Sequence, residues 1–313
     1  MQRIYISVCL ICLLVWFGCD SKGQPGAVTD DKLRVVTTIG MITDVVKNVG
    51  GTRVEVTGMV EAGVDPHFYN PTAKDVQMLG SAHIIFYNGL HLEAKMGDIL
   101  AKMSEDILTI PVTDAIDRSL LITHSEYEEL YDPHLWFDVS LWMQVVEKVR
   151  DVLSEFDADN SVLYRSNAER YLTKLVELDE YIKSQVERVP SEQRVLVTAH
   201  DCFHYFGMAY RFEVRGLQGI STTTEVGIAD IQDLATFIAE RGISAIFAES
   251  SVSSRSLEAV KTAVKAKGFG VEIGGQLFTD AMGNEGTPEG TYIGMIRYNI
   301  DTIVYALIEE SEL

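Results

Sequence analysis

The chain has 313 residues and a formal net charge of −20, from 46 acidic and 26 basic side chains. Because phosphate binding requires a basic surface, this charge argues against nucleic acid as a partner. A hydrophobic content of 47% is ordinary for a globular protein and excludes global disorder, and the length suggests about two domains.

The N-terminus carries a pattern typical of an export signal. A charged start at Arg3 is followed by fourteen apolar or small residues, IYISVCLICLLVWF. This run is too short to span a bilayer, which takes roughly 20 residues. Residues 1–18 are therefore predicted to be a signal peptide. Residues 19–32 are polar, contain Gly and Pro, and are predicted to be a short tether.

The cysteines agree with an exported protein that relies on its core. Cys9 and Cys12 lie in the predicted signal and Cys19 directly follows it, which leaves Cys202 as the only cysteine of the folded body. No internal disulfide is therefore expected there.

From Leu33 onward, short apolar runs alternate with amphipathic stretches. Strands are predicted at 33–39, 54–60, 83–88 and 108–114, and helices at 41–50 and 72–82. Thr72 is the expected N-cap of the second helix. This alternation predicts a parallel sheet with helices on both faces.

The middle of the chain reads as helical. No Gly or Pro occurs between Asp138 and Val189, and residues 160–189 place apolar side chains at helical spacing. A helix of this length spans about 45 Å, which is enough to run the length of a small domain. We expect residues 156–189 to form a linking helix that ends at Pro190.

The alternation restarts after this helix. Strands are predicted at 194–199, 244–250 and 270–275, and helices at 201–210, 228–242, 254–268 and about 290–310. The predicted fold class is α/β. Two lobes, at 33–155 and 190–313, each hold a parallel sheet flanked by helices, and one long rigid helix joins them.

The tripeptide Asp-Pro-His occurs twice, and ends at His67 and at His134. Proline fixes φ and lacks a backbone donor, so it stiffens the loop that aims each imidazole. The neighbouring carboxylates of Asp65 and Asp132 are candidates to orient a ring nitrogen of the histidine.

His67 and His134 lie in loops after strands of the first lobe, His200 ends a strand of the second, and Asp280 follows another. Ligands of open α/β sheets collect at the carboxyl ends of strands. If the two lobes face each other with those ends, the four side chains meet in the cleft. Three neutral imidazoles and one carboxylate form a complete, near-tetrahedral shell for a divalent ion.

The remaining histidines are open to other interpretations. His204 follows His200 by four residues and is an alternative ligand, and His91 could line the cleft. His83 is expected to be structural and His124 to face solvent.

The sequence resembles the TroA/ZnuA-like, or cluster A-I, metal-binding lipoproteins of ABC importers, and is most similar to their TroA branch. The similar stretches run from about Leu33 to the C-terminus: DPHFYNPTAKDVQML, YNGLHLEAKM, DPHLWFDVSLW, LVTAHDCFHYFGMAYRFEVRGLQGISTTTE, IFAESSV and GGQLFTDAMGNEGTPEGTYIGMIRYNIDTIVYAL.

This resemblance implies that the four side chains in the cleft are metal ligands, namely His67, His134, His200 and Asp280. Gly18-Cys19 resembles the end of a bacterial lipoprotein signal, so that Cys19 is lipidated and anchors the protein to the membrane, in the periplasm or at the cell surface. Trp16 departs from the usual leucine, and His204 stands where the family usually has a small residue.

The resemblance also implies a function. A protein of this family is the extracytoplasmic solute-binding component of an ABC transporter; it carries Zn²⁺ or Mn²⁺, with Fe²⁺ also possible, to a permease served by a cytoplasmic ATPase. The expected form is a monomer that is not an enzyme. A surface adhesin is the alternative, and a metallohydrolase a weaker one, because the chain has no HExxH motif and four protein ligands leave no open position.

Overall fold

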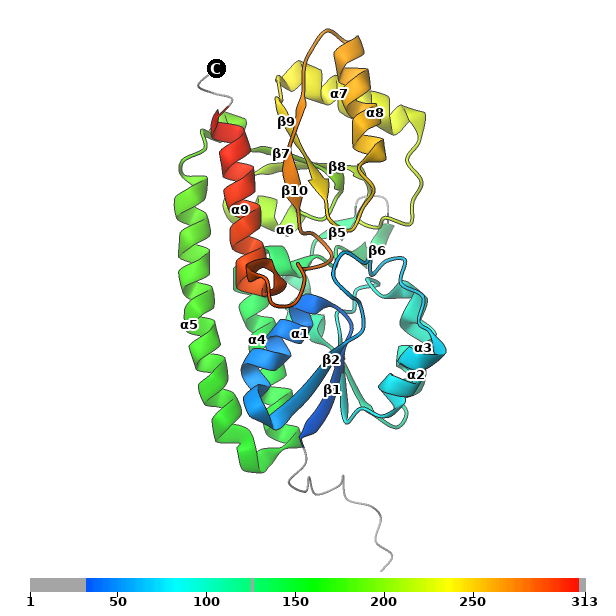
Figure 1. Cartoon of the computed structure of the whole chain (residues 1–313), viewed down its shortest axis with the longest axis vertical. Helices are drawn as coiled ribbons and strands as arrows, with labels where there is room; N and C mark the ends of the chain where they lie inside the picture. Colours follow the sequence, from blue (N-terminus) through cyan, green and yellow to red (C-terminus); the bar gives the residue numbers. More distant parts are fainter. Residues whose placement is uncertain (1–31, 125–126, 310–313) are drawn as a thin grey trace, which may run out of the picture. The chain divides into compact units, whose positions relative to one another are not determined.

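The structure is a computed structural model that describes residues 32–124 and 127–309 (Figure 1). The predicted signal peptide, Cys19 and the tether as far as residue 31 lie outside the described residues. Within the described ranges, no helix is both long and apolar enough to cross a membrane.

The N-terminal lobe is built on a parallel sheet of strand order β2-β1-β3-β4. Its strands are β1 (Leu33–Thr37), β2 (Val54–Gly58), β3 (Ile84–Tyr87) and β4 (Leu108–Pro111). Its helices are α1 (Gly40–Gly50), α2 (Ala73–Gly80) and α3 (Gly97–Met103). Figure 1 shows α1 on one side of the sheet and α2 and α3 on the other, which confirms the predicted arrangement.

Helix α2 begins where the sequence places its cap. The Thr72 hydroxyl accepts a hydrogen bond from the Asp75 backbone N–H at 3.3 Å, and the Asp75 carboxylate accepts one from the Thr72 N–H at 2.7 Å. This reciprocal pair satisfies backbone donors that a helix N-terminus leaves free. The helix directly follows the loop that carries His67, so the cap also fixes the end of that loop.

The connection to the second Asp-Pro-His loop contains an antiparallel strand pair that was not predicted from the sequence. Strand β5 (Thr123–His124) pairs antiparallel with β6 (Tyr127–Tyr131), and His134 follows β6. His134 therefore leaves a short hairpin and not the end of a parallel strand.

The helical middle of the chain is two helices and not one. Helix α4 (Val139–Phe156) ends before Asp157, and α5 (Ser161–Val186) runs back beside it (Figure 1). The buried Asp157 carboxylate accepts a hydrogen bond from Tyr164 Oη at 2.7 Å. Its two oxygens also accept from Asn160 Nδ2, at 3.0 Å and 2.9 Å. These side-chain bonds stabilise the turn, which residue periodicity alone does not reveal.

Helix α5 is attached to both lobes. In its first half, Tyr171 Oη donates to Asp44 Oδ2 of α1 at 2.6 Å. Near its end, Tyr181 Oη donates to Asp301 Oδ1 at 2.5 Å, a residue of α9 (Tyr292–Glu309). Because one continuous helix holds elements of both lobes, wide hinge motion between them is disfavoured.

The C-terminal lobe holds two parallel ladders, β7–β8 and β9–β10, with β7 beside β9. Its strands are β7 (Val195–His200), β8 (Glu213–Gln218), β9 (Ala245–Glu249) and β10 (Glu272–Leu277). Its further helices are α6 (His204–Tyr210), α7 (Ile228–Arg241) and α8 (Arg255–Ala266). Helices α7 and α8 pack on β7 and β9 in one apolar core, whereas α9 lies against β10.

Two boundaries in this lobe differ from the prediction. Helix α6 begins at His204 and not at residue 201, so His200 and the residues after it form a strand end and a turn. Strand β10 extends to Leu277, which shortens the connection to Asp280.

The buried hydrogen bond between Tyr171 and Asp44 generates a stability prediction. Burial raises the pKa of Asp44, and the Tyr171 hydroxyl opposes that rise. We expect Tyr171→Phe to lower the free energy of unfolding by about 1–3 kcal/mol near neutral pH. In the variant, the Asp44 pKa is raised further in the folded state only, so ionising Asp44 destabilises the folded variant more than the folded wild type. The difference in the free energy of unfolding between wild type and variant should therefore grow between about pH 4 and about pH 8.

Chemical denaturation at both pH values measures this. Tyr181→Phe is the matched control, because it removes the same hydroxyl from an exposed pair on the same helix, and it should change the stability by no more than about 0.5 kcal/mol. Equal losses for the two variants, or a Tyr171→Phe deficit that shrinks with rising pH, would contradict the prediction.

Candidate metal centre

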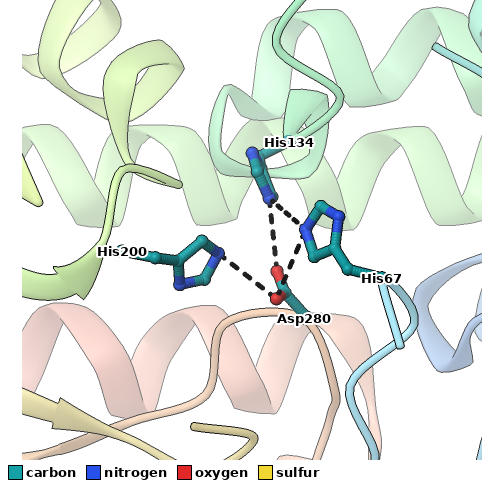
Figure 2. A group of neighbouring side chains, drawn as sticks. All are labelled: His67, His134, His200 and Asp280. Carbon is teal, nitrogen blue, oxygen red and sulfur yellow. Dashed lines mark hydrogen bonds and ion pairs between the residues drawn. The ribbon is translucent and has the colours of Figure 1, made fainter. Parts of the chain in front are cut away.

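The four predicted side chains meet between the lobes, as Figure 2 shows. His67 follows β2, His134 follows β6, His200 ends β7 and Asp280 follows β10. Their candidate ligand atoms all lie within 4.8 Å of one another.

The three Nε2 atoms face the Asp280 carboxylate and each other. His67 Nε2 lies 3.3 Å from His134 Nε2 and 3.8 Å from Asp280 Oδ2. His134 Nε2 is 3.4 Å from Asp280 Oδ1, and His200 Nε2 is 3.2 Å from Asp280 Oδ2. Nitrogen lone pairs and a negative charge thus share a space of a few ångströms, which a cation would stabilise.

The centre is deeply buried and internally unsatisfied. His134, His200 and Asp280 have 0% of their surface exposed, and His67 has 3%. Neither carboxylate oxygen of Asp280 makes a hydrogen bond of normal geometry to a described residue, and nor does His200 Nε2. A buried charge without partners is expensive, so this donor set fits a bound divalent ion.

Electrostatics within the cluster show the same demand for positive charge. Burial opposes ionisation of Asp280, yet His200 and His134 hold its pKa well below the usual range. Burial also opposes charging of His134, yet Asp132 and Asp280 raise its pKa. Burial lowers the pKa of His67 to about 3, so this ring stays neutral. A metal ion supplies the same positive charge without protonating a ligand.

Two carboxylates outside the cluster orient two of the rings. Asp132 Oδ1 accepts from His134 Nδ1 at 2.7 Å, as predicted, and Glu249 Oε2 accepts from His200 Nδ1 at 2.5 Å. Each bond places the ring hydrogen on Nδ1 and leaves the Nε2 lone pair aimed at the centre. Glu249 Oε1 also accepts from the His200 backbone N–H at 2.8 Å.

Asp65 acts differently from its counterpart Asp132. Its Oδ1 accepts from the His67 backbone N–H at 2.8 Å, and its Oδ2 accepts from Thr222 Oγ1 at 2.6 Å. The prediction that Asp65 orients a ring nitrogen was wrong, because its second oxygen turns towards the other lobe.

His204, the alternative ligand, lies outside the cluster. Its Nδ1 donates to Asp132 Oδ2 at 3.1 Å, on the far side of that carboxylate from His134. His204 therefore fixes the residue that orients a ligand and does not itself approach the centre.

The other histidines take their own places. His91 lines the cavity beside the cluster, which confirms that prediction. His83 precedes β3, and its Nδ1 accepts from the Arg34 backbone N–H at 3.1 Å, a structural role. The backbone of His124 belongs to β5, and its side chain lies outside the described residues.

A second group of possible donors shares His200 and adds Glu249 and Cys202. Glu249 and His200 already bond each other in this group. Burial raises the pKa of the Cys202 thiol well above its usual range, which keeps it protonated. Because His200 Nδ1 and Glu249 already bond each other, the described residues leave no complete set of free donors in this second group.

Trp136 connects the two halves of the site, a role that no sequence pattern predicted. Its indole N–H donates to the Thr279 carbonyl at 3.0 Å, and its ring packs edge-on against His134 at 5.2 Å between centroids. The Thr279 hydroxyl in turn donates to Glu249 at 2.9 Å. The only sequence signal for Trp136 is its position two residues after His134.

The two-lobed α/β fold around three histidines and one aspartate is that of a metal-binding protein of the cluster A-I class. The chain belongs to the family described as "ZnuA: Zinc-uptake complex component A periplasmic", whose profile matches residues 35–306.

The chain is similar to metal-binding proteins over almost all of its length. It is 46% identical over 308 residues to the zinc-binding protein TroA of Treponema pallidum (strain Nichols), covering 98% of this chain and 99% of TroA. It is 43% identical over 290 residues to the manganese-binding lipoprotein MntA of Bacillus subtilis (strain 168), covering 93% and 94%. The solved structure of TroA from Treponema pallidum matches with a TM-score of 0.86 and 48% identity, over 88% of this chain and 99% of that one.

Proposed function

We propose that this protein is the extracytoplasmic binding component of an ABC importer, which captures a divalent transition metal ion and delivers it to a membrane permease. The observation that carries the proposal is the buried, unsatisfied Asp280 carboxylate encircled by three imidazole nitrogens. Relatives named as zinc-binding and manganese-binding proteins, and as substrate-binding lipoproteins of metal ABC transporters, support it.

In this proposal His67, His134, His200 and Asp280 are the ligands, and the ion is the cargo. The protein does no chemistry on the ion. Asp132 and Glu249 keep two of the rings in the tautomer that binds metal. Because α5 resists wide hinge motion, loading and release proceed through local movements of the loops around the site.

The ligand set favours nitrogen-preferring ions. Three imidazoles and one carboxylate suit Zn²⁺ and also accommodate Mn²⁺ or Fe²⁺. By the intrinsic order of affinities Zn²⁺ exceeds Mn²⁺, so the ion carried in the cell also depends on which metal is available.

The same proposal covers the parts of the chain around the site. Residues 1–18 act as the export signal, Cys19 carries the lipid anchor and residues 19–32 form the tether. The folded body consists of lobes at 33–155 and 190–313 with the linking segment 156–189 between them. It acts as a monomer, and its partners are an ABC permease and a cytoplasmic ATPase. Relatives named as substrate-binding lipoproteins of metal and manganese ABC transporters support the choice of partners.

The alternatives receive no comparable support. A catalytic zinc site keeps a position open for water, whereas here four buried donors surround the ion's place. The relatives reported above are named for metal binding, and none of these names describes an adhesin or a hydrolase.

The ligand assignment predicts the effect of removing His67. The purified protein should bind a single Zn²⁺ ion. Loss of a residue that only hydrogen-bonds a metal ligand lowers affinity roughly 10–100-fold, and His67→Ala should lower the Zn²⁺ affinity by more than this. Isothermal titration of the metal-free protein, with metal analysis, measures both. His91→Ala is the control, since His91 lines the neighbouring cavity outside the cluster. A wild type without a stoichiometric ion would refute the function, and equal affinities for the two variants would refute the ligand assignment.

The role of Glu249 generates a second prediction. In Glu249→Gln the side-chain amide can donate to His200 Nδ1, which moves the ring hydrogen to Nε2 and blocks that ligand. We expect Zn²⁺ to bind about 10–100-fold more weakly, as measured by competition with a chromogenic chelator. Glu225→Gln, an exposed position on the cavity wall, is the control. Unchanged affinity in Glu249→Gln would show that the carboxylate does not set the tautomer.

The donor set also predicts an order of affinities. Titration of the Mn²⁺-loaded protein with Zn²⁺ should replace the Mn²⁺ at near-stoichiometric Zn²⁺, because imidazole nitrogen favours Zn²⁺. Metal analysis after desalting measures the exchange. Retention of Mn²⁺ against equimolar Zn²⁺ would mean that the geometry of the site overrides the intrinsic order.

A further inference from the structure

A cavity of about 830 Å³ lies between the lobes beside the metal centre. Of the four candidate ligands His67 alone lines this cavity, and the other three have no exposed surface. An ion that exchanges with solvent through this cavity therefore passes on the His67 side of the site.

One wall of this cavity is the chain between β8 and α7, residues 219–227, called here the β8–α7 loop. Its residues are exposed or half-buried except Thr222, which is 5% exposed. The Thr222 hydroxyl donates to Asp65 Oδ2 of the N-terminal lobe at 2.6 Å. Among the described residues, this is the one hydrogen bond that joins the loop to that lobe.

This bond reaches a ligand through Asp65. The other oxygen of Asp65 accepts from the His67 backbone N–H at 2.8 Å, so two consecutive hydrogen bonds run from the loop to His67. The rings of His134 and His200 are each held by a carboxylate. No described residue outside the cluster hydrogen-bonds the His67 ring, so the position of this ligand depends on its backbone.

We propose that the β8–α7 loop is a lid over the route by which the ion enters and leaves, and that Thr222 is the positioning residue that latches it. The inference rests on the proposed function and adds a residue that controls release. While the hydroxyl holds Asp65, the wall of the cavity and the backbone of His67 are fixed together. When the hydroxyl leaves, the lid and the most accessible ligand are freed in one step.

Zinc release tests the latch. Each protein is loaded with Zn²⁺ and mixed in a stopped-flow instrument with excess chromogenic chelator, and the dissociation rate is recorded. Thr222→Val keeps the shape of the side chain but removes the hydroxyl, and should release Zn²⁺ roughly tenfold faster, the effect of losing a hydrogen bond to a carboxylate. Thr222→Ser restores a hydroxyl and should release at close to the wild-type rate.

Thr224→Val is the matched control. It makes the same exchange on the same loop at an exposed residue whose hydroxyl has no hydrogen bond to a described residue, and it should leave the rate unchanged. Should Thr222→Val not fold, Thr222→Ala removes the same hydroxyl with less bulk and takes its place.

A double-mutant cycle separates a latch from general loosening. In an Asp65→Ala background the acceptor is already gone, so Thr222→Val should add no further acceleration. Additive effects would overturn the proposal, as would a wild-type rate in Thr222→Val, or a Thr222→Ser variant as fast as Thr222→Val. If the wild type binds Zn²⁺ and the variants give any of these results, the latch alone is overturned. If the wild type takes up no Zn²⁺, both the latch and the proposed function are overturned.

Discussion

The structure depends on one buried negative charge. Asp280 has no exposed surface, and neither of its oxygens has a hydrogen-bond partner of normal geometry among the described residues. A carboxylate in such a place is stable only beside a positive charge, which here comes from protonated imidazoles or from a metal ion. Among the described residues, His200 and His134 hold the pKa of Asp280 well below its usual range, and a metal ion would supply positive charge at the same place.

The rest of the fold holds these groups at the right distance. Each lobe supplies two of them, and bonds across the lobes keep the halves in register: Trp136 reaches the Thr279 carbonyl beside Asp280, and His204 reaches Asp132 beside His134. Helix α5 secures the arrangement at a larger scale, because it bonds α1 from its first half and α9 from its second half. Orientation of the ligands is thus a property of the joined lobes and not of either lobe alone.

Most helices and strands, and the four side chains of the site, could be predicted from the sequence. The hydrogen bonds that hold the site and its supporting helices in place could not. The repeated Asp-Pro-His and the positions at strand ends were visible, because strand periodicity and loop chemistry are local. The break at Asp157 was missed because it depends on Tyr164 and Asn160, whose hydrogen bonds exist only in the folded chain. Trp136 was missed for the same reason, since its partner Thr279 lies 143 residues away. The different geometry of Asp65 likewise follows from Thr222, a contact between lobes that no local pattern encodes.

If the proposed function and latch hold, the site separates how tightly the ion is held from how fast it can leave. Affinity is set by all four donors and by the carboxylates behind His134 and His200, which are locked inside the protein. Speed is set by the donor that can move first, and His67 is the only one at the cavity wall. A carrier needs tight capture outside the membrane and prompt release at its permease. Because the movable ligand is held through a loop of the other lobe, a partner that displaces this loop can speed release while three donors stay in place.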